Sequence, residues 1–126
     1  MNFEVLAEEL AVCRLPPDAA VPGGILDAAF CAVTRTADEL SLVLSVDQVA
    51  PGWEEVERIW RALKIQGPLD FSMVGVIARI SAPLADAGIP IFVVSTFETD
   101  YLLVKNDQFE KTCALLLNAG HAISNA

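Results

Sequence analysis

The sequence IFVVSTFETDYLLVKNDQF, residues 91–109, contains two apolar strands separated by a short acidic turn. Residues 89–96 are rich in β-branched and aromatic side chains, which favour a strand. Residues 98–100 turn the chain, and residues 101–105 return as the second strand. This stretch therefore predicts a β-hairpin.

The same pattern occurs earlier in the chain. Residues 30–49, FCAVTRTADELSLVLSVDQV, also contain an apolar strand, an acidic turn and a second apolar strand. The match is close where the second strand ends, because residues 46–49 are VDQV and residues 106–109 are NDQF. Such self-similarity indicates an internal repeat. We predict two related units, residues 1–60 and residues 61–126.

The second repeat contains the elements of a complete domain. Before the hairpin come a strand at residues 60–65 and a helix at residues 72–86, with apolar residues at helical spacing. After the hairpin come a helix at residues 107–118 and a short strand at 121–123. The predicted order is β-α-β-β-α-β, the ferredoxin-like arrangement.

The first repeat keeps the hairpin but shortens the helices. Residues 21–29 contain Pro22, Gly23 and Gly24, and residues 53–58 allow only about two helical turns, given 3.6 residues per turn. A degenerate copy beside a full copy predicts an α+β protein, with helices on one side of each sheet.

Composition and charge exclude several classes of protein. The chain has 126 residues, of which 54% are hydrophobic and 20% charged, so it is neither disordered nor large enough for several ordinary domains. The net charge of −9 argues against nucleic acid and anionic membranes as partners. No segment has the roughly 20 consecutive apolar residues of a membrane span. The first ten residues carry three glutamates, unlike a signal peptide, so we expect a cytoplasmic protein.

Neither a metal nor a cofactor is expected. Cys13, Cys31 and Cys113 are far apart in sequence, and His121 is the only histidine, so no standard zinc pattern can be written. The cysteines lie among apolar neighbours and are expected to be reduced residues of the core. The apolar surplus of so small a chain favours pairing with another subunit.

Three motifs resemble those of a known family. They are GPLDFS at residues 67–72, SAPLA at 81–85 and STFETDY at 95–101. With them the chain resembles ACT domain-containing proteins of the small bacterial group related to the CASTOR arginine sensors. The resemblance implies two tandem ACT-like units, the first degenerate. It also implies pairing of units across a homodimer and an amino acid bound at an ACT–ACT interface.

The resemblance also implies which residues surround the ligand. The start of the first helix would hold its α-amino and carboxylate groups, the segment at 96–97 would form the other wall, and Asp100 suits a cationic end. Met73 stands where the related sensors carry an acidic residue. The residues implied at the ligand are Ser72, Met73, Val74, Gly75, Val76, Thr96, Phe97 and Asp100.

Physical chemistry leaves alternatives open at several of these positions. A helix start offers unpaired N–H groups and partial positive charge, which suit a carboxylate. Gly75 would allow a ligand close to the backbone, or would merely let a strand pack against the helix. Asp100 is also a common turn residue, and Thr96 can satisfy its hydroxyl within the sheet. Phe97 fits either a pocket or the core.

Three kinds of function compete. The leading hypothesis is an amino-acid-binding regulatory module acting as a homodimer, and the second is an interaction scaffold with a vestigial pocket. The third is a small enzyme that hydrolyses acyl phosphates, which we disfavour because no arginine lies in a glycine-rich phosphate loop. His121 is expected to be a polar surface group without a catalytic role.

Overall fold

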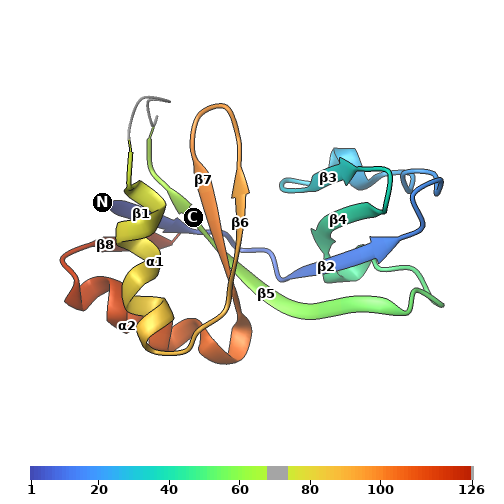
Figure 1. Cartoon of the computed structure of the whole chain (residues 1–126). Helices are drawn as coiled ribbons and strands as arrows, with labels where there is room; N and C mark the ends of the chain where they lie inside the picture. The colour runs from blue at the N-terminus through green and yellow to red at the C-terminus, as the bar shows by residue number, and fades with distance from the viewer. Residues whose placement is uncertain (68–73, 126) are drawn as a thin grey trace. The chain divides into compact units, whose positions relative to one another are not determined.

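The computed structural model describes residues 1–67 and 74–125 and divides into two compact units (Figure 1). One, here called the small unit, contains residues 8–60. The other, here called the helical unit, contains residues 1–7 and 61–126. The sequence alone groups residues 1–7 with the first repeat, whereas in the structure they lie in the same compact unit as the second repeat.

The small unit is a four-stranded antiparallel sheet. Its strands are β2 (Leu10–Leu15), β3 (Ala32–Arg35), β4 (Leu40–Ser45) and the first part of β5 (Glu55–Ile65), in the order β3-β4-β2-β5. Two 3-10 turns, η1 (Ile25–Asp27) and η2 (Val46–Gln48), occupy the positions of the two helices in the chain order. Proline and glycine at 22–24 and 51–52 explain why neither turn continues, because both residues disfavour helix.

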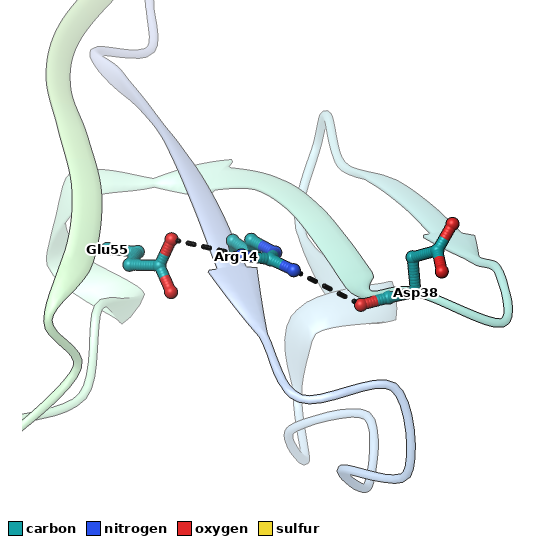
Figure 2. Close-up of polar contacts among 3 residues, drawn as sticks. All are labelled: Arg14, Asp38 and Glu55. Carbon is teal, nitrogen blue, oxygen red and sulfur yellow. Dashed lines mark hydrogen bonds and ion pairs between the residues drawn. The ribbon is translucent and has the colours of Figure 1, made fainter.

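The predicted short helix at 53–58 is wrong, because β5 begins at Glu55. Glu55 lies opposite Arg14 of β2, and their side chains form an ion pair at 3.5 Å (Figure 2). Arg14 also donates to the carbonyl oxygen of Asp38 at 3.3 Å. Val56 packs against the core of the small unit. Pairing with β2 gives hydrogen-bond partners to the backbone N–H and C=O groups at the start of β5. A helix of only two turns would leave most of these groups without a partner inside the helix.

The helical unit contains the predicted β-α-β-β-α-β elements. They are the second part of β5, α1 (Val76–Asp86), β6 (Ile91–Ser95), β7 (Asp100–Lys105), α2 (Phe109–Asn118) and β8 (Ala122–Asn125). The 3-10 turn η3 (Asn106–Gln108) precedes α2. α1 begins at Val76, and the residues before it, Val74 and Gly75, are not helical. The predicted helix start at residue 72 is therefore wrong, and Ser72 itself lies outside the described residues. The α+β prediction for this unit is confirmed.

The sequence did not predict that the helical unit also contains the first strand of the chain. β1 (Asn2–Val5) lies between β5 and β8, antiparallel to β5 and parallel to β8, so that the strand order is β6-β7-β5-β1-β8. Phe3 and Val5 belong to the same buried core as residues of both helices and the neighbouring strands. The helical unit thus needs a strand from the opposite end of the sequence.

The two hairpins show that the internal repeat extends to atomic detail. In the small unit, Thr36 and Glu39 close the turn with a backbone bond of 2.9 Å, and in the helical unit Thr96 and Thr99 do so at 2.8 Å. In both turns the threonine hydroxyl accepts a bond from the backbone N–H of the closing residue. The second strand of each hairpin, β4 or β7, is followed directly by a 3-10 turn, η2 or η3. Similar sequences have therefore produced the same local structure twice.

The place of β1 predicts that Phe3→Ala will destabilise the helical unit by about 3–5 kcal/mol, the usual cost of removing a buried aromatic ring. Phe3 is 0% exposed. Urea unfolding followed by far-UV circular dichroism measures this, because both α-helices lie in that unit. Leu26→Ala is the control, since Leu26 is 72% exposed. Equal effects of the two substitutions would contradict the assignment.

Candidate functional site

A tightly bonded turn joins β6 to β7. The Thr99 amide donates to Thr96 Oγ1 at 3.3 Å, and Thr96 Oγ1 lies 3.1 Å from the Thr99 carbonyl oxygen. Thr99 is only 4% exposed, and its hydroxyl donates to the carbonyl oxygen of Ile65 at 2.6 Å. This bond fixes the turn against the end of β5. It has no counterpart at Glu39, whose charged side chain lacks a hydroxyl.

The start of α1 lies at the same end of the helical unit. Only ten residues separate the last residue of β5 from the first of α1, and Figure 1 shows the α1 start and the β6–β7 turn at one end. Val76 also shares a buried core with Ile65 and Leu102. The described parts of the two segments that the sequence assigned to the ligand therefore lie at the same end of the helical unit.

The α1 start has the features of an anion site. Gly75 precedes the helix with φ +73°, without a side-chain cap among the described residues, and the first turn carries no acidic residue. Arg79 Nη1 lies 3.4 Å from the Val74 carbonyl oxygen, which brings a guanidinium to the same place. The N–H groups of a first helical turn have no acceptor within the helix, so they and this cation would both attract a carboxylate.

The predicted ligand residues are placed differently from one another. The Val74 and Phe97 side chains are 83% and 81% exposed, whereas Val76 is buried and offers only its backbone. The Thr96 hydroxyl belongs to the turn. Asp100 is half-buried and shares a strand face with Leu102, which packs against the helices. Ser72 and Met73 lie outside the described residues. A ligand role for these eight residues stays a prediction.

A small pocket beside the turn was missed by sequence reasoning. Its volume is about 110 Å³, and its lining residues are Lys64, Gly67, Glu98 and Thr99. Lys64 alternates with the core residues Leu63 and Ile65, so it lies on the strand face turned away from the helices. The alternation of Lys64 with apolar residues along the strand was the sequence signal for this position. An ordinary surface lysine on a strand shows the same alternation, so the signal does not identify a pocket.

Two thiols of the chain, those of Cys13 and Cys113, are poorly suited to nucleophilic chemistry. Burial raises the pKa of the Cys13 and Cys113 thiols above their ordinary value, with Arg58 and Arg61 respectively acting in the opposite direction. The thiolate is the reactive form, so a raised pKa disfavours reaction near neutral pH. All three cysteines are free; Cys13 is buried, but Cys31 and Cys113 are only partly so.

His121 is half-buried, in contrast to the expected surface position. Its Nδ1 lies 2.9 Å from the amino group of Met1, and its ring meets the ring of Phe3 edge-on, with centroids 5.5 Å apart. Burial and the charge of the amino group lower the pKa of His121. The side chain thus packs where β1 meets the loop before β8.

The described residues form neither a cluster suited to a metal ion nor a helix suited to crossing a membrane. Among residues 1–67 and 74–125, no group of three or more His, Cys, Asp or Glu side chains is placed to hold a metal ion. None of the helices formed by the described residues is long and apolar enough to cross a membrane.

The fold defines a class of small α+β domain, and comparison with known proteins gives the family. The ACT domain model matches residues 55–118, and a second family model, described as an N-terminal domain, matches residues 8–52. The chain belongs to the ACT domain family.

Solved structures of other proteins share the fold of this chain. The crystal structure of a protein from Agobacterium tumefaciens is 38% identical with a TM-score of 0.91, covering 99% of this chain and 92% of that one. Aspartate kinase of Clostridium acetobutylicum shares the fold, with a TM-score of 0.60 and 15% identity over 89% of this chain and 33% of the kinase.

A curated relative matches over a shorter segment. The human protein named cytosolic arginine sensor for mTORC1 subunit 1 is 44% identical over 50 residues, or 39% of this chain. The match spans only 15% of the sensor's length.

The Thr99–Ile65 bond predicts that Thr99→Val will lower the free energy of unfolding by about 1–3 kcal/mol, because a buried carbonyl loses its donor. Valine keeps the shape of the side chain, so packing changes little. Urea unfolding measures the loss, and Thr34→Val on an exposed part of β3 serves as the control. A Thr99→Val protein as stable as the control would show that the bond does not hold the turn.

The conformation of Gly75 predicts that Gly75→Ala will cost about 1–2 kcal/mol, because a Cβ is disfavoured at positive φ. Gly75→Asn should lose less, since asparagine tolerates this region. Gly23→Ala is the matched control, because Gly23 has no positive φ and open space around it. Thermal unfolding ranks the three variants, and equal losses for Gly75→Ala and Gly23→Ala would contradict the prediction.

Proposed function

We propose that this protein is a regulatory module that binds a free amino acid between ACT units of a homodimer. The similarity to the cytosolic arginine sensor, 44% over 50 residues, is the observation that carries the proposal. The helical unit adds an α1 start suited to a carboxylate, and Asp100, at the start of β7, suits a cationic ligand group. No catalytic residue, metal or organic cofactor is part of the proposal.

Binding between subunits would give the module its output. A ligand that contacts both copies stabilises the paired state over the separate one, and the pairing state then changes with amino-acid concentration. We place this activity in the cytoplasm, because free cysteines are typical of a reducing compartment. We propose neither nucleic acid nor a membrane as partner, because the net charge of −9 disfavours both.

An interaction scaffold with a vestigial pocket is the second candidate. The large exposed side chains of Val74 and Phe97 favour it, because apolar groups at one end of a unit are suited to contact with another protein. Under this alternative, pairing would occur without any response to amino acids.

A thermal-shift panel of the twenty amino acids tests the proposal. A ligand at 100 times its Kd should add about 2.7 kcal/mol of stability. For a chain of this size that raises Tm by about 5–15 °C. We expect a basic amino acid to give this shift and Asp100→Ala to abolish it, because the variant lacks the carboxylate that faces the cationic group.

Asp107→Ala is the matched control, since Asp107 is an exposed aspartate of the same unit. It should leave the shift intact. Light scattering after size exclusion, with and without the amino acid, reports the pairing state. A chain that stays monomeric throughout would refute the proposal. A chain that pairs, but that none of the twenty amino acids stabilises, would refute it and favour the scaffold.

A further inference from the structure

The outer strand of the small unit, β3, leaves one of its two edges open. Among the described strands it pairs with β4 alone, in a register that runs without a bulge. The Thr36 amide donates to the Glu39 carbonyl oxygen at 2.9 Å, and this bond sets the alternation along the antiparallel pair. Thr34 is therefore bonded to β4, whereas the backbone N–H and C=O groups of Val33 and Arg35 point toward the open edge.

These outward backbone groups are available to another strand. Among residues 1–67 and 74–125, no loop or side chain forms a hydrogen bond with the backbone of Val33 or Arg35. The Arg35 side chain is held elsewhere, because it donates to the carbonyl oxygens of Pro17 and, at 2.6 Å, of Ala19, which packs against the core. β3 contains neither a proline nor a bulge, the devices that commonly protect an edge strand.

One face of this edge ends in an incompletely buried apolar row. Val56, Cys13, Leu42 and Val33 lie directly opposite one another across the four strands of the small unit. Leu42 and Cys13 are buried, whereas Val33, at the end of the row, is 36% exposed. An apolar side chain that a further strand placed beside Val33 would continue the row and remove more of it from water.

The charge of the small unit defines which strand can be added. Residues 8–60 contain three arginines against ten acidic residues, so most of the net charge of −9 belongs to this unit. Asp18 lies between the two carbonyl oxygens that Arg35 binds, and Asp38 lies in the turn that follows β3, so both are at one end of the edge. Among the described residues neither carboxylate forms an ion pair within 4.0 Å, and Figure 2 shows that of Asp38 directed away from Arg14.

We infer that the β3 edge binds an extended, positively charged segment of a partner protein as an additional strand. The backbone groups of Val33 and Arg35 supply the hydrogen bonds, and Val33 selects an apolar residue at the position opposite it. The acidic side chains around the edge attract lysine and arginine and speed association. A second copy of the chain is disfavoured as occupant of this edge, because two acidic units would meet.

This interaction goes beyond the proposed function and does not depend on it. All the residues that carry it belong to the small unit, whereas the residues predicted at the amino acid belong to the helical unit. The amino-acid panel and a peptide titration therefore report on different parts of the chain, and either can fail while the other succeeds.

Titration of the full ¹⁵N-labelled chain with the capped peptide Lys-Thr-Thr-Val-Thr-Thr-Lys tests the inference. Saturable shifts of the Val33 and Arg35 amides are expected, and added salt should weaken binding because it screens the charges. A peptide with glutamate in place of both lysines should bind at least about tenfold more weakly, and so should one with proline in place of the valine, which lacks the N–H donor.

Variants of the chain test the same contacts from the other side. Val33→Pro removes an outward N–H without taking a bond from β4, so it should abolish the shifts at Arg35 while the β2 and β4 amides keep their positions. Asp18→Asn combined with Asp38→Asn should weaken the peptide about threefold or more, as loss of two exposed ion pairs does. Asp86→Asn combined with Asp107→Asn changes the net charge equally through exposed residues of the helical unit and should leave binding normal.

The other outcomes would overturn the inference. They are the absence of saturable shifts at Val33 and Arg35, equally tight binding of the glutamate peptide, and equal losses in the two pairs of aspartate variants. Shifts at these two amides that depend on protein concentration in the absence of peptide would overturn it as well, and would identify a second copy as the occupant of the edge. The peptide comparisons decide the matter even if Val33→Pro does not fold.

Discussion

Insertion of β1 between β5 and β8 is the constraint on which the helical unit depends. The strand bonds to a neighbour on each side and places Phe3 and Val5 in the core beneath α1 and α2. Without it, β5 and β8 would each expose an edge, and the core would lose a fully buried aromatic ring. Because β1 and β8 come from opposite ends of the sequence, this sheet forms only when distant segments meet. The candidate site is built at the far end of β5, so its geometry rests on this pairing.

The two repeats contain the same hairpin turn but differ in how that turn is bonded to the neighbouring strand. Both hairpins have a threonine that accepts a bond from the residue closing the turn. In the small unit the closing residue is Glu39, whereas in the helical unit it is Thr99, whose hydroxyl reaches the Ile65 carbonyl oxygen. One substitution within a repeated turn thus ties the hairpin to the neighbouring strand. The shortened helices of the small unit, reduced to 3-10 turns, leave no helix start of useful length there. The residues predicted at the ligand accordingly all belong to the helical unit.

The end of the helical unit that holds the β6–β7 turn and the α1 start carries cationic side chains, although the chain as a whole is acidic. The net charge is −9, yet the α1 start carries Arg79 rather than an acidic cap, and Lys64 lines the adjacent pocket. Glu98 lies on the β6–β7 turn, and Asp100 begins β7 directly after it. Cationic and anionic groups thus occur at the same end of the helical unit. An arrangement of this kind suits ligands that carry both charges, whereas a surface for nucleic acid would be uniformly basic.

The sequence by itself determined the elements whose signal is local. The hairpins at β3–β4 and β6–β7, the amphipathic helices α1 and α2 and the repeat all follow from periodicity and turn chemistry within short windows. The segments that the resemblance implies at the ligand, residues 72–76 and 96–100, come from motifs contiguous in sequence, and their ligand role stays a prediction. Only the tertiary structure decided the place of β1, the strand conformation of residues 55–58 and the pocket at Lys64 and Glu98. Each of these depends on pairing between distant segments, since β1 needs β8, Glu55 needs Arg14 and Thr99 needs Ile65. Local propensity contains no information about such partners, because the free energy that favours them is gained only on contact.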